Sequence, residues 1–500
     1  MEARLGAVDI VILAGYCLVV VALGVYYTRK CRTAEQFMVA GRSIPAWAAG
    51  LAIMSTYTSS ISYIATPGKA YDTNWHPLIF ALTIFPVAWI ACRYAVPYYR
   101  KMKLVSVYEF LEERIGPWGR AYAALSFLLY IVGRTAVILY LVSLLLSQFL
   151  AWPIVTIIVV IGIVTIVYTL LGGMEAVIWT DVMQSIIMVG GLIFCAVSLS
   201  WRIFRGPEPL IQAAVDARKF SLGGWDLSLS SRTIWVMVIY GVTENLRNLL
   251  ADQNFVQKYS SVPTEREARR SIWIGMAIYI PMTAVFLYIG TALFAFYSGQ
   301  AGSVVGKGDE AFPYFIATQL PAGMKGLILA AVMAAAMSTV DSALNCSATV
   351  VLMDFYKRYV NPHVTDRASL LCLRVTTVLW GLLGTGFAVL MIRAKSALDI
   401  WWQISGIFGG GILGLFLLSL LRVRLGLWQG LVCVGVSVAV ICWGTFARDL
   451  PERWAWAEAS FEPIIVGAAG TAALMLIALL FGLVNRWMLA TDGVSSQEQL

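Results

Sequence analysis

Charged residues, histidines and spaced cysteine motifs are all scarce in this 500-residue chain. Charged residues make up 13% of it and only two histidines occur, whereas soluble domains carry about 25% charged residues. The eight cysteines show no CxxC spacing and mostly lie inside apolar runs, so we expect core residues rather than a zinc or haem site. Because a catalytic triad and a separate soluble domain are also lacking, no enzymatic activity is predicted, and a membrane enzyme or sensor is a remote alternative.

Long apolar runs dominate the chain instead. Hydrophobic residues make up 60% of it, and about 20 consecutive apolar residues suffice to cross a bilayer as a helix. We therefore predict an all-α polytopic membrane protein with about 13 transmembrane helices. The predicted spans are 7–27, 45–66, 76–97, 119–149, 153–171, 175–200, 232–250, 271–298, 325–353, 370–393, 398–421, 425–446 and 461–485.

The net charge of +8 (36 − 28) is explained by the side of the membrane, since cytoplasmic loops are enriched in Lys and Arg. Cations at 100–103, at 266–270 and at Lys258 fall in loops on one side if the N-terminus is outside. The expected location is therefore the plasma membrane or bacterial inner membrane, with a cytoplasmic C-terminus and no nucleic-acid partner. No cleavable signal peptide is expected, because the first apolar run lacks a basic flank before it.

The short loops predict a single transmembrane transporter domain. It covers residues 1–490, and no repeat is visible in the sequence, although an inverted structural repeat is compatible with such a chain. Its predicted parts are a first core half at about 45–200, a second core half at about 232–421, peripheral helices at 7–27, 425–446 and 461–485, and a polar C-terminal tail at 491–500.

The run AAAMSTVDSALNCSATV, residues 334–350, combines an apolar background with polar side chains. Spacings of three and four residues place four of them on one stripe of a helix: Ser338, Asp341, Ser342 and Asn345. Hydroxyls alone are common packing groups between spans. An intramembrane carboxylate costs about 2.5–3.5 kcal/mol on insertion scales, so Asp341 favours a functional site. With Thr339 beside it, this oxygen-rich face suits a hard cation.

The second predicted span contains MSTYTSSISY, Met54 to Tyr63, whose Ser and Thr residues point in every direction of a helical wheel. No single interface would satisfy so many hydroxyls in lipid. The pattern therefore predicts a local break that lines a cavity, where freed backbone carbonyls can ligate a cation. The alternative is a packing face rich in Ser and Thr.

Two further charges lie within predicted spans. Asp181, in VIWTDVMQS, has no cation near it in sequence; its alternative role is a carboxylate that reaches the inner interface. Arg134, in YIVGRTAVILY, lies near the middle of its span and must meet an anion. That anion is either internal, such as Asp181, Asp341 or Glu244, or a substrate carboxylate, which a guanidinium binds in a bidentate fork.

The seventh predicted span is also interrupted by polar residues, in YGVTENLRNLLADQ, residues 240–253. Glu244 and Arg247 are three residues apart and are expected to pair. A broken helix is predicted here too. The second and seventh spans would be the first helices of two five-helix halves, and interruptions at corresponding positions indicate the binding site of an inverted-repeat transporter.

Together these segments resemble the sodium/solute symporter family, and most closely its bacterial sodium–sialic acid symporters. The resemblance covers most of the chain and implies a LeuT-type core of ten helices with one span before it and two after it. The segments that carry it are AGRSIPAWAAGLAIMSTYTSSISYIATPGKAY, YEFLEERIG, GRTAVILYL, YTLLGGMEAVIWTDVMQ and AAAMSTVDSALN.

The resemblance also implies two sites for Na+, the only cofactor expected. The principal site would use the backbone carbonyls of Ser55, Thr58 and Ala335 and the hydroxyls of Ser338 and Thr339. The second site would use Thr56, Asp181, Ser338, Asp341 and Ser342. The sialic acid branch has a serine where this chain has Asp341, so a carboxylate there would bind a cation or share a proton.

For the solute, the resemblance places Arg134 against a carboxylate, with help from Tyr57, Ser59 and Ser62. Two positions depart from the branch, because Tyr57 replaces a threonine and Ala81 replaces a pocket glutamine. The predicted function is sodium-coupled import of a small organic anion, most simply sialic acid or a related acidic sugar. The alternative is sodium-coupled import of a neutral sugar, polyol, amino acid or monocarboxylate, with Arg134 neutralised in the first three cases by Asp341 or Glu244.

Overall fold

The computed structural model describes residues 5–204, 210–298, 305, 307–393, 397–421, 425–447 and 452–495. Every regular element within these ranges is helical, which confirms the all-α class. Nine helices of the described ranges are long and apolar enough to cross a membrane, and one bent pair, residues 34–42 with 46–57, makes a tenth candidate. The count of thirteen spans stays a prediction.

The long helices and the short ones have the following bounds. The long helices are α1 (Ala7–Thr28), α5 (Pro77–Ile90), α8 (Pro117–Leu150), α9 (Ile154–Phe204), α13 (Glu265–Ser298), α15 (Met324–Val350), α16 (Asp366–Leu390), α17 (Ala397–Leu420), α18 (Leu427–Phe446) and α19 (Val466–Ser495). The shorter ones are α2 (Ala34–Val39), α3 (Ala46–Tyr57), α4 (Ser60–Asp72), α6 (Val96–Lys101), α7 (Glu109–Arg114), α10 (Leu210–Asp216), α11 (Ile234–Leu246), α12 (Gln253–Ser260) and α14 (Gly308–Gln319). Two π-helical segments, η3 (Arg247–Ala251) and η4 (Val351–Val360), continue α11 and α15.

The predicted break in the second span is present between α3 and α4. Thr58 (φ −102°, ψ 104°) and Ser59 (φ −106°, ψ 176°) are extended between the two helices. The hydroxyls of Ser55 and Thr56 both donate to the Ala52 carbonyl at 2.8 Å. Such side-chain bonds compete with the helical hydrogen-bond ladder, which helps to explain why α3 ends here.

The second broken helix is formed by α11, η3 and α12. Its chain becomes extended at Asp252 (φ −95°, ψ 118°), and the Asp252 carboxylate accepts from the backbone N–H of Asn254 to cap α12. The predicted interruption is therefore confirmed, and it lies on the C-terminal side of Glu244 and Arg247. The segment after the break, α12, is buried along its whole length.

Helix α9 is divided at Gly173, which has φ +58° and ψ −153°. A Cβ atom at this position would lie 2.8 Å from the Cα atom of Phe37, so the close approach of α2 as well as the positive φ requires glycine. The division falls between the predicted spans 153–171 and 175–200.

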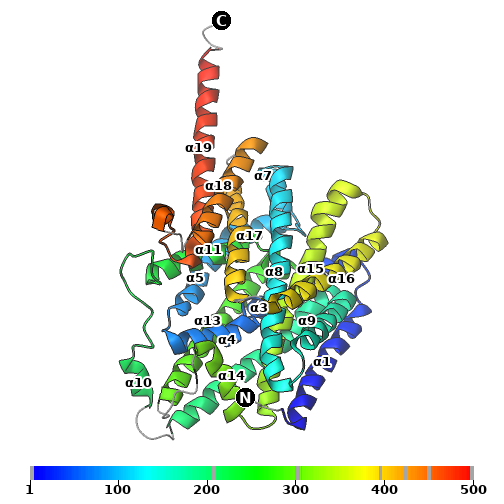
Figure 1. Ribbon diagram of the computed structural model, residues 1–500. Coiled ribbons are helices and arrows are strands. Elements are labelled where there is room, and N and C mark those ends of the chain that lie inside the picture. Colours follow the sequence, from blue (N-terminus) through cyan, green and yellow to red (C-terminus); the bar gives the residue numbers. More distant parts are fainter. Residues whose placement is uncertain are drawn as a thin grey trace.

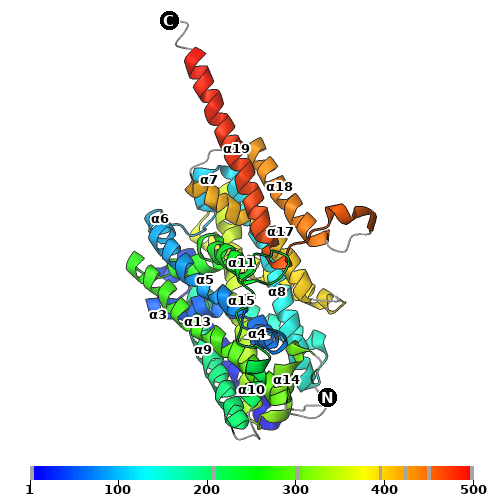
Figure 2. The same cartoon turned by 90° about the vertical axis from the view of Figure 1, so that its left-hand side faces the viewer.

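The polar helix α15 lies at the centre of the molecule (Figures 1 and 2). It packs against α9, α1, α8 and α16. In its most apolar stretch of 18 residues 94% of the residues are buried, compared with 28% in that of α1. Helices α18 and α19 pack on one another and on α17, and α19 projects beyond the other helices in both views. Helix α19 continues to Ser495, into the predicted polar tail at 491–500, and residues 496–500 lie outside the described residues.

Candidate functional site

A cavity of about 290 Å³ lies beside the α3–α4 break, between these two helices and helices α8, α11 and α13. All four residues predicted to bind the solute line it: Tyr57, Ser59, Ser62 and Arg134. Its size is close to the lower limit of about 300–1,000 Å³ for small-molecule sites. The arrangement therefore suits one small solute held by polar groups at the break.

Arg134 enters this cavity from α8. Its Nη2 atom donates to the Thr56 carbonyl at 3.1 Å, at the C-terminal end of α3. Among the described residues, this carbonyl is the only hydrogen-bond acceptor of the guanidinium, and no carboxylate there forms an ion pair with it. A guanidinium has five N–H donors, so Arg134 retains donors for a planar anionic group.

The three internal partners considered for Arg134 bind elsewhere. Asp181 forms an ion pair with Lys258. Glu244 forms an ion pair with Arg247, as their spacing predicted. Asp341 accepts from the hydroxyl of Tyr168 at 2.7 Å and from the backbone N–H of Ser342 at 2.5 Å. The hypothesis that one of these three carboxylates neutralises Arg134 is therefore wrong for this structure.

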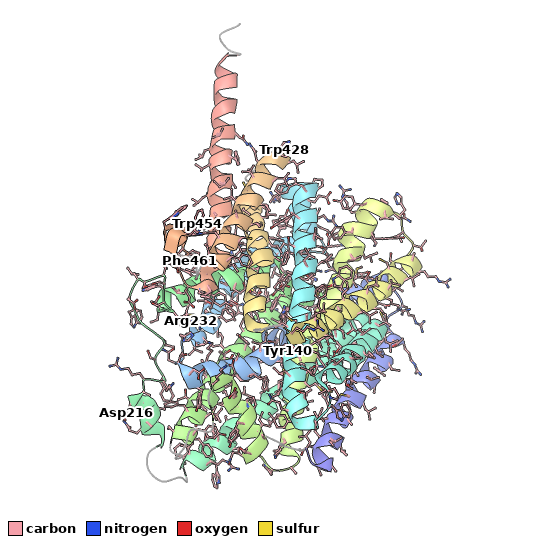
Figure 3. The ribbon with its side chains drawn as sticks, in the orientation of Figure 1. Tyr140, Asp216, Arg232, Trp428, Trp454 and Phe461 are labelled. Atoms are coloured by element: carbon pink, nitrogen blue, oxygen red, sulfur yellow. The ribbon has the colours of Figure 1, made fainter. Side chains whose placement is uncertain are left out.

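Other charges around the cavity are arranged in pairs. Arg247 is held by Glu244. The Nε atom of Arg232 lies 2.6 Å from the Oε1 atom of Glu462, and Figure 3 shows Arg232 on the same side of the molecule as Phe461, which precedes Glu462 in the chain. These pairs leave the positive charges of Arg134 and Lys69 in the lining. The electrostatic balance of the cavity is therefore positive and favours an anion.

An aromatic wall narrows the cavity. The ring of Tyr57 lies 4.5 Å from that of Phe255 and 5.0 Å from that of Tyr279, centroid to centroid. Ala81, the second departure from the sialic acid branch, is fully buried and does not belong to the residues that line the cavity. The change at Tyr57 therefore alters the lining of the solute cavity directly, whereas the side chain of Ala81 does not reach the cavity.

The groups predicted for the principal sodium site come from the α3–α4 break and from α15, which pack against each other. All of them are buried. The hydroxyls of Ser338 and Thr339 both donate to the Ala335 carbonyl, at 3.2 Å and 3.1 Å, so three predicted ligands converge within one turn of α15. The set consists of neutral hydroxyl and carbonyl oxygens, which are donor atoms that a hard cation prefers.

The groups predicted for the second sodium site surround a lysine. Lys258, on α12, donates to the Oδ2 atom of Asp181 at 2.8 Å and to the hydroxyl of Thr56 at 2.5 Å. Both charged side chains are fully buried. The placement of Lys258 in a cytoplasmic loop was therefore wrong, because its ammonium group lies in the protein core.

Sequence reasoning missed Lys258 as a functional residue, although two signals pointed to it. A buried Asp181 with no cation nearby required a partner from elsewhere in the chain. The segment DQNFVQKYS, residues 252–260, is too polar for an ordinary span and directly follows the interrupted seventh span. Neither signal identifies the pair, since 77 residues separate its members.

The arrangement of two broken helices around a central polar helix, with a cavity and the predicted sodium ligands at the first break, is typical of a secondary transporter. Comparisons with known proteins agree with this class. The sequence profile of the sodium:solute symporter family matches residues 37–429. The chain belongs to this family.

Relatives and solved structures extend the comparison. The chain is 30% identical to the sodium/sialic acid symporter SiaT of Proteus mirabilis, over 92% of this chain and 94% of that protein. It is 32% identical to the sodium/sialic acid symporter NanT of Aliivibrio fischeri (93% and 94%), and 28% identical to the human sodium-coupled monocarboxylate transporter 1 (89% and 75%). A solved Na+-coupled sialic acid symporter, in a substrate-bound outward-open state that reveals a novel Na+-site, matches with a TM-score of 0.87 at 27% identity, over 96% of this chain and 98% of that one.

A more distant structure supports the fold alone. Mhp1, a nucleobase-cation-symport-1 family transporter, matches with a TM-score of 0.54 at 15% identity, over 91% of this chain and 95% of that one. The fold is therefore LeuT-like, as predicted from the interrupted spans and the family resemblance. The protein is a sodium-coupled symporter with a multi-pass membrane domain.

Proposed function

We propose that this symporter imports an acidic sugar together with Na+, with a sialic acid as the first candidate. The observation that carries the proposal is Arg134, which lines the cavity and finds one backbone carbonyl and no carboxylate among the described residues. A carboxylate of the solute would complete its hydrogen bonding and neutralise its charge. The hydroxyls of Ser59 and Ser62, which line the same cavity, suit the polar groups of a sugar.

A neutral solute is disfavoured by the same geometry. It would leave Arg134 without an anionic partner in a membrane protein core, where unpaired charge is costly. The carboxylates that were candidates for this role, Glu244 and Asp341, have partners of their own.

A small monocarboxylate is the second candidate. The aromatic wall of Tyr57, Phe255 and Tyr279 narrows the cavity, which favours an acid smaller than a sialic acid. A monocarboxylate would use Arg134 in the same way, without requiring the hydroxyls of Ser59 and Ser62. The 28% identity to a human sodium-coupled monocarboxylate transporter supports this candidate.

The principal site at the α3–α4 break would supply the coupling. A sodium ion bound by Ser55, Thr58, Ala335, Ser338 and Thr339 would join the break to α15, which packs against α3 and α4. Thr56 and Tyr57, next to these ligands in sequence, line the solute cavity. Bound sodium would therefore fix the break in the shape that presents these residues to the solute.

The proposed orientation has the N-terminus outside and the C-terminus in the cytoplasm. With the N-terminus outside, the predicted spans place the loops 201–231 and 299–324 outside as well. In Figure 1 the start of α1 lies at one end of the molecule, together with α10 and α14 from these two loops. The end of α19 lies at the opposite end, together with α7 from a loop predicted inside. This arrangement supports an odd number of crossings.

Uptake into proteoliposomes tests the function. A sodium gradient should drive accumulation of N-acetylneuraminic acid, lactate or both, whereas an equal choline gradient should not. The methyl ester of each acid, which keeps the shape and loses the charge, is the matched control and should not be accumulated. Accumulation of ester and acid alike, or of neutral sugars only, would overturn the proposal for an acidic solute.

A further inference from the structure

Lys258 occupies a position that has the chemistry of a cation site. Its ammonium group donates to three oxygen atoms: the Ala52 carbonyl at 2.9 Å, the Thr56 hydroxyl at 2.5 Å and the Asp181 carboxylate at 2.8 Å. An ammonium group has three N–H donors. The three acceptors, from α3 and α9, therefore satisfy all of its donors, and its charge compensates that of Asp181.

The acceptors of Lys258 overlap the predicted second sodium site. Thr56 and Asp181 are two of the five groups expected there, and both are engaged by the lysine. A sodium ion bound to Asp181 would lie beside the ammonium group, where like charges repel. The remaining Oδ1 atom of Asp181 is buried without a hydrogen-bond partner among the described residues, and one oxygen is too few to hold a hard cation.

Two other groups of the second site, Asp341 and Ser342, are hydrogen-bonded without a cation. The hydroxyl of Ser342 donates to the Ser338 carbonyl at 2.9 Å, within α15. Asp341 accepts hydrogen bonds at both oxygens, from the Tyr168 hydroxyl at Oδ2 and from the Ser342 backbone at Oδ1. Neutral donors therefore bind both oxygens of the Asp341 carboxylate, and no cation is needed between Asp341 and Asp181.

The principal site is not affected in this way. Among the described residues, the acceptors of Lys258 are Ala52, Thr56 and Asp181, and none of them is a predicted ligand of the principal site. The ammonium group therefore does not contact the predicted oxygen ligands of the principal site.

We propose that the Lys258 ammonium is a tethered cation that permanently fills the second cation site, so that each solute is carried with a single sodium ion. The proposal rests on the sodium-coupled function given above and adds its stoichiometry. A tethered charge does not cross the membrane with the solute. One sodium ion with one monoanion moves no net charge, whereas two sodium ions would move one positive charge per cycle and respond to the membrane potential.

Sodium alone provides the first test, since it needs no knowledge of the solute. Thermal unfolding of the full-length protein in detergent is followed in NaCl at constant ionic strength, with choline chloride as the balance. A ligand that binds only the folded state stabilises it according to its concentration and number of sites. Wild type should follow the slope for one bound sodium ion; a slope for two would overturn the proposal.

Flux measurements in proteoliposomes supply the second test. Wild type should take up sodium and N-acetylneuraminic acid, or lactate if that is the transported acid, in a ratio of one to one. A potassium diffusion potential set with valinomycin should leave the initial rate unchanged. A ratio of two to one with a potential-dependent rate would overturn this inference alone, whereas uptake that does not depend on sodium would overturn the proposed function.

A pair of variants tests the role of Lys258 itself. Lys258→Met removes the charge, keeps most of the side-chain length and leaves Asp181 free to recruit a second sodium ion. The Hill coefficient for sodium should rise above one. The matched control, Lys258→Met with Asp181→Asn, removes both charges and should return it to one. If Lys258→Met transports with an unchanged one-sodium ratio, the site is not a cation site and the proposal fails; if that variant does not fold, the wild-type ratio decides.

Discussion

The two broken helices carry opposite kinds of polar group at their breaks. The α3–α4 break is rich in neutral oxygens, from residues such as Ser55, Thr58 and Ser59. The break between α11 and α12 is flanked by charges that face one another: Arg247 pairs with Glu244 and lies 3.5 Å from Asp252. The residues of the α3–α4 break are therefore polar and uncharged, whereas the residues of the second break are charged and form ion pairs with one another.

This difference separates mobile ions from fixed ones. Carbonyl and hydroxyl oxygens attract a cation but leave it free to depart, since no full negative charge holds it. At the second break every charge described is compensated by a side chain, and α12 carries the cation Lys258 into the core. The α3–α4 break is therefore suited to exchange an ion, and the break between α11 and α12 to hold charges in place.

The largest effect is expected when the fixed pair is broken. Asp181→Asn would leave the fully buried ammonium of Lys258 without its carboxylate, at a cost of about 3–5 kcal/mol in stability. Thermal unfolding in detergent measures the loss. Asp181→Asn combined with Lys258→Met should lose much less, because residues in one network couple. A double variant whose loss equals the sum of the two single losses would show that the charges do not form a pair.

Removal of the neutral oxygens should affect sodium next most strongly. Ser338→Ala with Thr339→Val keeps the shape of α15 and deletes two predicted ligands. The sodium concentration for half-maximal uptake should rise by at least about 100-fold, because two bonds to a charged group contribute about 1.5–3 kcal/mol each. Solute affinity at saturating sodium should change less. An unaltered sodium dependence would assign the two hydroxyls to helix packing.

Substitutions at Arg134 test whether the solute is recognised by its carboxylate beside the α3–α4 break. Arg134→Lys keeps the charge and loses the planar fork, which should weaken binding of an acidic solute roughly 10- to 100-fold. Arg134→Ala should be worse. Binding of the acid and of its amide to each variant gives the comparison, because the amide should be insensitive to the change. If wild type binds acid and amide equally well, Arg134 does not read a carboxylate.

The smallest effect is expected at the second break. Glu244→Gln removes one partner of Arg247, which still has Asp252 at 3.5 Å and the ring of Tyr130 at 4.8 Å. The expected loss of stability is about 1 kcal/mol, measured by thermal unfolding. Asp252→Asn is the matched comparison, and should cost more because Asp252 is more deeply buried than Glu244. A reversed order would place the main counter-charge of Arg247 at Glu244.

The parts of the site that depend on local sequence could be predicted. Ser and Thr residues around the whole helical wheel at 54–63 required a break, and the helix ends at Tyr57. The positions of Asp341 and Arg134 within their spans indicated function because isolated charge is costly in lipid. The pairing of Glu244 with Arg247 followed from their spacing.

Long-range charge pairing could not be predicted in the same way. Lys258 lies in a segment followed by Glu265, Arg266 and Glu267, so its surroundings in sequence are those of a loop at the membrane surface. Only the fold of α12 into the core brings it to Asp181. The break at Asp252, which allows this fold, lies within the polar segment 240–253, but that segment does not show where α12 packs.

The ion pair of Lys258 with Asp181 also limits how far the solute can be concentrated in the cell. With a single sodium ion per solute and no net charge moved, the solute ratio across the membrane cannot exceed the sodium ratio, so a sodium ratio of about ten supports a solute ratio of about ten. A second sodium ion would square that factor and add the contribution of the membrane voltage. A cell that relies on this protein therefore takes up each molecule with the smallest inflow of salt, and gathers its nutrient to a lower final level.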